Sequence, residues 1–289
     1  MRIQDALNEG TSALKKVQGL ETPYLDALLL LCAAIGKKKE FLLTYPQAEL
    51  DAAQYKKYKA FIKKRANGIC SAYLIGEKEF YGHTFLVNKN VLVPRPDTET
   101  LVSAALDHME AVYRHDNDFS ILDLCCGSGA IALSLLHAAA ASGKKNVVVY
   151  ASDISKKALK VSLANAKKLN LNLNLVHGNL FKAFKKKGNN IKFDIIVSNP
   201  PYVRGSDIQL LTKEVRNEPR LALDGGTDGL DIIRCITADA RSFLKSGARL
   251  FLEADPAQMP EIRTLLAAYT DIRVHNDLSG NERVISARA

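Results

Sequence analysis

The sequence predicts an α/β protein in which a mostly parallel, helix-covered sheet follows a small helical bundle. Two observations support this. Beyond residue 95 of the 289-residue chain, strand-like and helix-like segments alternate, as βαβ units require. Before residue 73, apolar residues recur at helical spacing. The seven expected strands lie near residues 120–124, 147–152, 172–176, 193–198, 247–253, 272–275 and 284–288, with helices between most of them.

Residues 1–72 are expected to form the N-terminal bundle. Thr22-Pro23 has the pattern of a helix start, with the threonine as cap and the proline at the first helical position, and Gly36 has the pattern of a stop. A later helix is expected from Asp51 to about Ala66. Residues 73–94 then change to short β-rich runs punctuated by Gly and Asn, which predicts a β-hairpin linking the bundle to a domain of residues 95–289.

The composition is that of an ordinary globular protein, because 47% of the residues are hydrophobic and 25% are charged. The longest strongly apolar segment, residues 27–35, is about half of the roughly 20 residues that a membrane span needs. Asp5 and Glu9 stand where a signal peptide would need its apolar core. We therefore expect a cytoplasmic protein with no membrane partner. The five cysteines show no ligand spacing, so we expect no metal site.

The net charge of +9 is unevenly spread, because residues 1–70 hold 12 Lys and Arg against 7 Asp and Glu. A basic first segment suits an acidic partner, either protein or nucleic acid. A solvated Lys-rich surface is the commoner explanation of such a pattern. The charge alone leaves both interpretations open.

A glycine loop follows the first strand of the sheet domain, in the stretch "SILDLCCGSGAIALSLL". An apolar strand ends near Asp123, Gly127 and Gly129 follow, and a helix comes next. Glycines let the backbone turn tightly and approach a ligand closely, at a point where the helix N-terminus offers free N–H groups. The loop therefore predicts a nucleotide-like cofactor.

Two carboxylates indicate which cofactor binds. The G-x-G-x-x-A pattern fits a dinucleotide, but Asp123 at the strand end would repel a pyrophosphate and attract the α-ammonium of S-adenosylmethionine (SAM). Asp153 closes the next strand, where a carboxylate can accept both ribose hydroxyls of either cofactor. The alternative is that the two aspartates merely cap the following helices. The sequence favours SAM.

The stretch "FDIIVSNPPYV" ends a buried strand on Asn199-Pro200-Pro201-Tyr202. The prolines fix an extended, stiff loop at the carboxyl end of the strand. There the Asn199 side-chain carbonyl and the Pro200 main-chain carbonyl can accept hydrogen bonds from one planar NH₂ group and orient its lone pair toward a methyl donor. Tyr202 can pack against the flat face of that acceptor. A structural proline turn is the alternative.

These segments resemble the Class I SAM-dependent methyltransferases that modify exocyclic or amide nitrogens. The blocks "VLVPRPDTETLV", "NEPRLALDGGTDGLDIIRCI" and "GNERVISAR" resemble more closely the HemK/PrmC family, the N5-glutamine methyltransferases of peptide chain release factors. The resemblance covers nearly the whole chain. It implies a Rossmann-like catalytic domain with a seven-stranded, mostly parallel sheet, and an N-terminal helical domain that docks the protein substrate.

The resemblance also implies roles for individual residues. Asn179 and Leu180 would lie by the adenine, and residues 199–202 would hold the glutamine, with Asn199, Pro200 and Tyr202 at the reacting group and Pro201 beside them. The cofactor site expected from the residues and the resemblance together comprises Asp123, Cys125, Cys126, Gly127, Ser128, Gly129, Asp153, Asn179, Leu180 and Asn199.

The sequence departs from the family pattern at two positions. A third glycine usually stands where this chain has Cys125, so that position must accept a small side chain. A carboxylate often stands at Asn179, whose amide oxygen can still accept from the adenine amino group. Arg95 and Glu99 in "PRPDTE" either line the site or lock the hairpin to the catalytic domain through an ion pair.

The expected function is methyl transfer from SAM to the glutamine side chain in the Gly-Gly-Gln loop of a release factor. Two rivals remain, a ribosomal protein as the glutamine substrate and an amino group of DNA or RNA as the acceptor. Against a stable nucleic-acid partner, the sequence offers neither a separate target-recognition domain nor an aromatic-rich basic stripe. A non-enzymatic nucleic-acid-binding module is disfavoured because both Asp153 and Asn199 are present.

Overall fold

The structure is a computed structural model that describes residues 1–185 and 191–289. The chain divides into two compact units. Unit 1 comprises Met1–Glu77 together with Leu211–Asn217, and unit 2 comprises Lys78–Leu210 and Glu218–Ala289. A short segment from the second half of the sequence thus belongs to the N-terminal unit.

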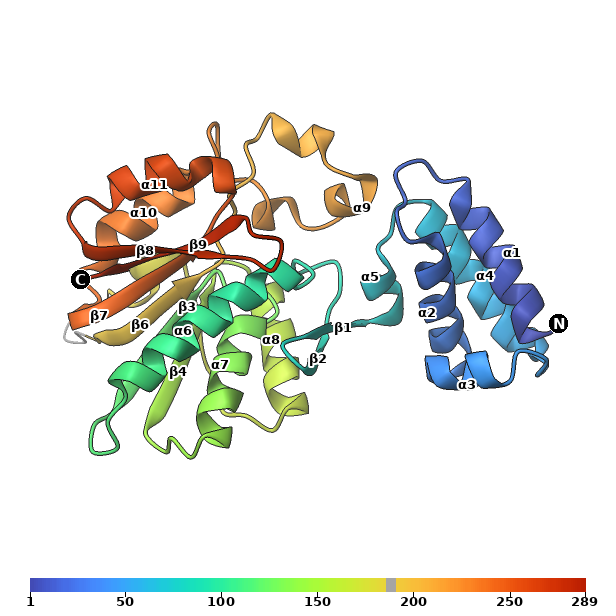
Figure 1. Ribbon diagram of the computed structural model, residues 1–289, viewed down its shortest axis with the longest axis horizontal. Helices are drawn as coiled ribbons and strands as arrows, with labels where there is room; N and C mark the ends of the chain where they lie inside the picture. The colour runs from blue at the N-terminus through green and yellow to red at the C-terminus, as the bar shows by residue number, and fades with distance from the viewer. Residues whose placement is uncertain (186–190) are drawn as a thin grey trace. The chain divides into compact units, whose positions relative to one another are not determined.

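Unit 1 is helical (Figure 1). Its helices α1, α2 and α4 pack against one another and bury a core that includes Leu7, Leu14, Leu30 and Leu31. The apolar spacing noted in the sequence therefore forms the contact faces of these helices. The helices are α1 (Ile3–Lys15), α2 (Pro23–Ile35), α3 (Lys39–Thr44), α4 (Ala52–Ala66), α5 (Ser71–Ile75) and the short α9 (Lys213–Arg216).

The helix boundaries in unit 1 follow the expected signals, with one exception. Helix α2 begins at Pro23, and Gly36 ends it with a φ of 70°, the left-handed conformation that glycine adopts without strain. Helix α4 begins after Asp51, whose carboxylate accepts from the Gln54 backbone N–H in a capping box. The expected threonine cap is wrong, because the Thr22 side chain makes no capping hydrogen bond and the fixed φ of Pro23 alone marks the start.

A buried ion network holds α9 on the other helices of unit 1. Arg65 of α4 is 5% exposed in its side chain and pairs with Asp26 of α2 at 2.9 Å and with Glu214 of α9 at 2.7 Å. Asp26 also accepts from the Ser71 hydroxyl. Because these charges are mostly desolvated, each depends on its partners for compensation.

Replacing Arg65 with alanine should destabilise unit 1 by about 3–5 kcal/mol, because it leaves Asp26 buried without its cation. Hydrogen exchange of the α2 and α4 amides in the full chain measures this unit separately from unit 2. The control is Lys59→Ala, which breaks the exposed 3.6 Å pair with Glu9 and should change the free energy by less than about 0.5 kcal/mol. Equal losses in both variants would contradict the assignment of a structural role to the buried network.

Unit 2 contains the seven-stranded sheet, and the expected α/β class and mostly parallel sheet are confirmed. The strand order is β5-β4-β3-β6-β7-β9-β8. The pairs among the first five strands are parallel, and β9 is antiparallel to both β7 and β8. The strands are β3 (Phe119–Leu124), β4 (Val147–Asp153), β5 (Asn174–His177), β6 (Phe193–Ser198), β7 (Leu244–Glu253), β8 (Thr270–Asn276) and β9 (Glu282–Arg288).

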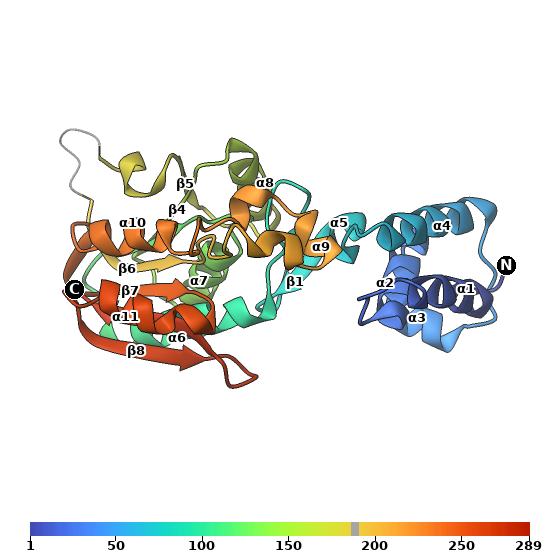
Figure 2. The same cartoon turned by 90° about the horizontal axis from the view of Figure 1, so that it is seen from above.

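Helices cover both faces of this sheet, as Figures 1 and 2 show. Helices α6, α7 and α8 lie on one face and α10 and α11 on the other, and each face has its own buried cluster. The central strands are apolar on both sides for this reason. The helices are α6 (Glu99–Val112), α7 (Ala130–Ala141), α8 (Lys156–Lys168), α10 (Asp231–Ala240) and α11 (Met259–Leu265), with single 3₁₀ turns at Pro96–Thr98, Leu180–Ala183, Asp207–Leu210, Arg220–Ala222 and Pro256–Gln258.

A two-stranded hairpin, β1 (Glu77–Phe80) and β2 (His83–Leu86), precedes the sheet at the expected place. Its turn is held by Glu99, whose carboxylate accepts from the Tyr81 backbone N–H at 2.8 Å. Across residues 1–185 and 191–289, the helices are all too short or too polar to span a bilayer.

Candidate functional site

Three adjacent parallel strands end at the same edge of the sheet. Strand β3 pairs with β4 on one side and with β6 on the other, and Leu124 is in register with both Ser152 and Ser198. The segments that follow these strands are the glycine loop, the turn after Asp153 and the Asn-Pro-Pro-Tyr loop. The carboxyl edge of the sheet therefore brings together three motifs that lie far apart in the sequence.

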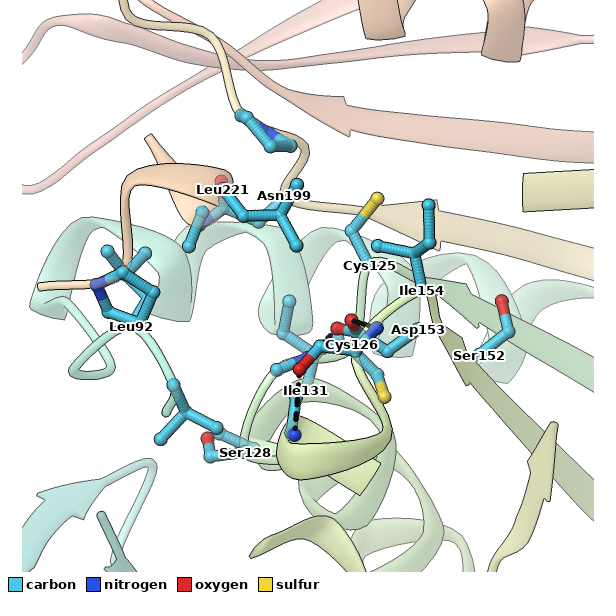
Figure 3. Close-up of a pocket in the computed structure, with 18 of the residues that line it drawn as sticks. Leu92, Cys125, Cys126, Ser128, Ile131, Ser152, Asp153, Ile154, Asn199 and Leu221 are labelled. Atoms are coloured by element: carbon cyan, nitrogen blue, oxygen red, sulfur yellow. Dashed lines mark hydrogen bonds between the residues drawn. The ribbon is translucent and has the colours of Figure 1, made fainter. Parts of the chain in front are cut away.

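A cavity of about 230 Å³ opens at this edge (Figure 3). The sequence-predicted residues that line it are Cys125, Cys126, Gly127, Ser128, Asp153, Asn179, Leu180, Asn199 and Pro201. Four other predicted residues, Asp123, Gly129, Pro200 and Tyr202, are not among the lining residues. The glycine loop and the Asn-Pro-Pro-Tyr loop thus face one cavity.

The glycine loop has left-handed φ values at alternate residues, with +61° at Cys125, +55° at Gly127 and +78° at Gly129. A Cβ built on Gly127 would meet no atom within 4 Å, so this face of the loop is open, whereas one on Gly129 would lie 3.2 Å from the Ser162 Cβ. Glycine adopts such φ values without strain. Cys125 occupies the first of these positions at a steric cost of about 1 kcal/mol, because its side chain carries a Cβ.

The two cysteine side chains leave the loop in opposite directions (Figure 3). Cys126 packs into the core below the loop, where its sulfur lies 3.7 Å from the Ser162 hydroxyl. Burial raises the pKa of the Cys125 thiol to about 12, so the thiol is neutral at physiological pH. Cys125 therefore contributes an uncharged surface to the cavity.

Asp153 ends β4 with its carboxylate bound to two backbone amides. One oxygen accepts from Gly127 N at 2.9 Å, and the other accepts from Ser155 N at 2.8 Å. Burial raises the pKa of Asp153, and these hydrogen bonds act in the opposite direction. The carboxylate lines the cavity and has lone pairs left to accept further donors.

Asp123 lies beneath the loop. Its Oδ2 accepts from the backbone N–H of Ala132 in the first turn of α7 at 3.2 Å, and Oδ1 has no partner among the described residues. Burial raises the pKa of Asp123 well above its ordinary value. In this arrangement Asp123 holds the helix that follows the loop, and its side chain does not line the cavity.

The Asn199 amide is held on its donor side. Its Nδ2 donates to Thr98 Oγ1 at 3.1 Å, which leaves Oδ1 as the acceptor at the cavity. Tyr202 is not among the residues that line the cavity; it packs against the core cluster to which α10 contributes, and its hydroxyl lies 3.4 Å from Glu253 Oε1. Burial raises the pKa of the Tyr202 hydroxyl, so it remains a donor.

Arg95 lines the cavity and is ion-paired at the same time. Its partner is Glu218, at 2.6 Å, which also accepts from the Val93 backbone N–H at 3.0 Å. Glu99 holds the hairpin through the backbone of Tyr81, as described above. Arg95 therefore lies at the cavity, whereas Glu99 contacts the hairpin.

Sequence reasoning missed three groups of site residues. Leu92, Leu221 and Ala222 add apolar walls to the cavity. Thr98 stands inside the "PRPDTE" block that drew attention to Arg95 and Glu99. Glu253 is an ionisable residue at the end of an apolar strand, the same signal that singled out Asp123.

Comparison with known proteins identifies the family. A release factor glutamine methyltransferase of Clostridium acetobutylicum is 37% identical over 99% of this chain and 98% of its own length. One of Coxiella burnetii is also 37% identical, over 100% of this chain and 99% of its own length. The chain belongs to the release factor glutamine methyltransferase family.

Two family models match parts of the chain. Residues 5–76 match the PrmC N-terminal domain, and residues 103–228 match the methyltransferase small domain. Among solved structures, the chain is similar to a 16S rRNA methyltransferase of Thermus thermophilus in complex with AdoMet and guanosine, with a TM-score of 0.51 and 17% identity over 73% of this chain and 49% of that one. That likeness supports the Class I methyltransferase fold, and the full-length relatives define the release factor glutamine methyltransferase family for this chain.

Proposed function

We propose that this protein transfers a methyl group from SAM to the side-chain amide nitrogen, N5, of the glutamine in the Gly-Gly-Gln motif of peptide chain release factors. The observation that carries the proposal is the Asn199 amide at the cavity, oriented so that an acceptor oxygen remains for a planar NH₂ group. Family membership agrees with this substrate, because the full-length relatives are named for it.

The residues of the cavity fit SAM. The open face of Gly127 leaves room beside the loop, and the Asp153 carboxylate ends the neighbouring strand, where ribose hydroxyls can donate to it. Asn179 and Leu180 follow β5 and line the same cavity, so the adenine is assigned to them. Their largely apolar surroundings suit the flat face of a base.

SAM supplies an electrophilic methyl group, and the chain supplies positioning. An amide nitrogen is a poor nucleophile because its lone pair is delocalised. Asn199 Oδ1 and the Pro200 carbonyl accept the two N–H bonds of the glutamine amide, which aims the nitrogen and stabilises the positive charge that develops on it. The methylated amide nitrogen then loses a proton readily, so a strong general base is not needed.

The apolar, rigid walls of the cavity favour a neutral amide over a charged side chain as the substrate. Pro201 lines the cavity beside Asn199, and Tyr202 anchors the end of the loop on the core cluster. A neutral amide can enter such a cavity without the desolvation cost of a charged side chain. Residues 1–72, with their excess of basic side chains, are proposed to dock the body of the release factor.

A competition assay tests the substrate class. Labelled SAM is supplied with a purified release factor, a ribosomal protein pool, duplex DNA and ribosomal RNA, each alone and then together. Label is expected on the release factor and should be lost when the Gly-Gly-Gln glutamine is replaced by asparagine. Label on the ribosomal proteins or on nucleic acid instead would still support methyl transfer from SAM but would contradict the release factor as the substrate.

A further inference from the structure

A chain of hydrogen bonds runs from Asn199 into the interior of unit 2. Asn199 Nδ2 donates to Thr98 Oγ1 at 3.1 Å, and the Thr98 hydroxyl lies next to the Glu253 carboxylate as a hydrogen-bond partner that lowers its pKa. Asn199 follows β6, Thr98 lies in the 3₁₀ turn before α6, and Glu253 ends β7. Ser198, the residue before Asn199, is in register with Leu252, the residue before Glu253.

This chain is shielded from solvent. Thr98 is 4% exposed and Glu253 is 1% exposed. A hydrogen bond in such a place is not exchanged readily for one to water, so the donor and acceptor of each link are fixed by the neighbouring link. The Glu253 Oε2 atom has no partner among the described residues, which leaves Thr98 and the long contact from Tyr202 to satisfy this carboxylate.

We propose that Thr98 and Glu253 are positioning residues that fix which end of the Asn199 amide faces the acceptor. The inference deepens the function proposed above and rests on it. An ionised carboxylate only accepts, so the Thr98 hydroxyl must donate to Glu253 and offer its lone pair to Asn199. Asn199 then has to present Nδ2 to Thr98, and Oδ1 turns to the substrate.

Protonation of Glu253 removes the constraint on the direction of the chain, because a neutral carboxyl can donate as well as accept. A neutral carboxyl can donate to Thr98, and Thr98 can then donate to Asn199 Oδ1. The amide is then free to flip, and in the flipped form its NH₂ group faces the NH₂ group of the substrate, where two donors meet without an acceptor. Only the ionised form fixes the Asn199 orientation that methyl transfer needs.

The Glu253 carboxyl gains or loses its charge near neutral pH. Burial is the main cause that raises its pKa to about 7, with Asp97 adding to the rise, while Thr98, Arg283 and Tyr202 oppose it. Arg283 is itself shared with Asp97 at 3.4 Å and with Asp277 at 3.3 Å. Because the pKa is raised above that of an exposed glutamate, the active orientation is present above about pH 7 and is lost as the pH falls through that value.

Thr98→Val and Thr98→Ser form the matched pair for the test. Valine has nearly the same shape but no hydroxyl, whereas serine keeps it. Thr98→Val should lower kcat about tenfold or more with the dissociation constant of SAM changed less than about twofold, because the lost contact acts on the acceptor. Thr98→Ser should restore most of kcat. Equal activity of the valine and serine variants would overturn the proposal.

A second measurement needs no methyl acceptor. The side-chain amide resonances of Asn199, assigned by their loss in Asn199→Ser, are followed by NMR from pH 5.5 to 8.5 in the protein without SAM. They should titrate with a midpoint near pH 7 and should not titrate in Glu253→Gln, whereas Glu282→Gln, an exposed control, should behave as wild type. An Asn199 amide that is indifferent to pH and to Glu253→Gln would overturn the proposal, even if the release factor is methylated.

The two measurements separate this inference from the proposed function. If the wild-type protein methylates no release factor, the function fails, and the NMR titration still decides whether Glu253 controls Asn199. If the wild-type protein is active and Thr98→Val is equally active, the function stands and the inference fails.

Discussion

Replacing Asn199 with alanine is expected to lower kcat by roughly 10²–10³-fold or more while leaving the affinity for SAM nearly intact. The amide is the side-chain acceptor at the cavity and is directed there by Thr98. Removal of one preorganised hydrogen-bonding group at a reacting centre costs a factor of this size. Single-turnover transfer of labelled methyl to a release factor measures the rate of the chemical step, and calorimetry measures SAM binding.

Asn199→Asp is the matched variant. It keeps an oxygen at the acceptor position and loses the donor to Thr98, so it should retain more transfer than Asn199→Ala. If alanine and aspartate were equally inactive and both bound SAM normally, the acceptor role of Oδ1 would have no support. The fold should survive both changes, because Asn199 is only partly buried at the end of β6.

Replacing Asp153 with alanine is expected to weaken SAM binding by at least about tenfold. The carboxylate can accept the ribose hydroxyls, and hydrogen bonds to a charged group are worth about 1.5–3 kcal/mol. It also holds Gly127 N and Ser155 N, so its loss loosens the glycine loop that cradles the cofactor. Calorimetric titration with SAM measures the change.

The two variants should therefore respond differently when SAM is raised to a saturating concentration. Asp153→Ala should recover part of its transfer rate at saturating SAM, and Asn199→Ala should recover none. An equal loss of SAM affinity in both variants would contradict the assignment of SAM binding to Asp153 and of acceptor orientation to Asn199.

The fold could be predicted to a large extent from the sequence because its signals are local. Alternating apolar segments predicted the sheet, Pro23 and Gly36 marked the bounds of α2, and the hairpin appeared where Gly and Asn cluster. Parallel strands place their carboxyl ends at one edge, so the glycine loop, Asp153 and Asn199 could be expected to meet. The cavity that all three line agrees with that expectation.

The features that could not be predicted from the sequence depend on contacts between residues that are distant in the chain. Thr98, Asn199 and Glu253 form one hydrogen-bonded chain across 155 positions, and only the register of β6 with β7 and the position of the turn before α6 bring them together. The direction of a side chain is equally hidden. Tyr202 is predicted to pack on the acceptor, and its contact with the core cluster and with Glu253 had no signal in the sequence.

The assignment of residues 211–217 to unit 1 depends on contacts of the same kind. Glu214 pairs with the buried Arg65, and Asn217 donates to the Gly68 carbonyl at 2.8 Å. Both residues lie in a polar stretch that has no apolar pattern to indicate its partner. A charge buried in one helix, here Arg65, becomes informative only when its partners are known.

The most direct test of the central claim is to locate the methyl group. A release factor is methylated with this protein and SAM, digested, and its Gly-Gly-Gln peptide is analysed by tandem mass spectrometry. The account predicts one added methyl group on the side-chain nitrogen of that glutamine, and none when Asn199→Ala is used. A methyl group on any other residue, or an unmodified glutamine beside methylated nucleic acid or ribosomal protein, would contradict it.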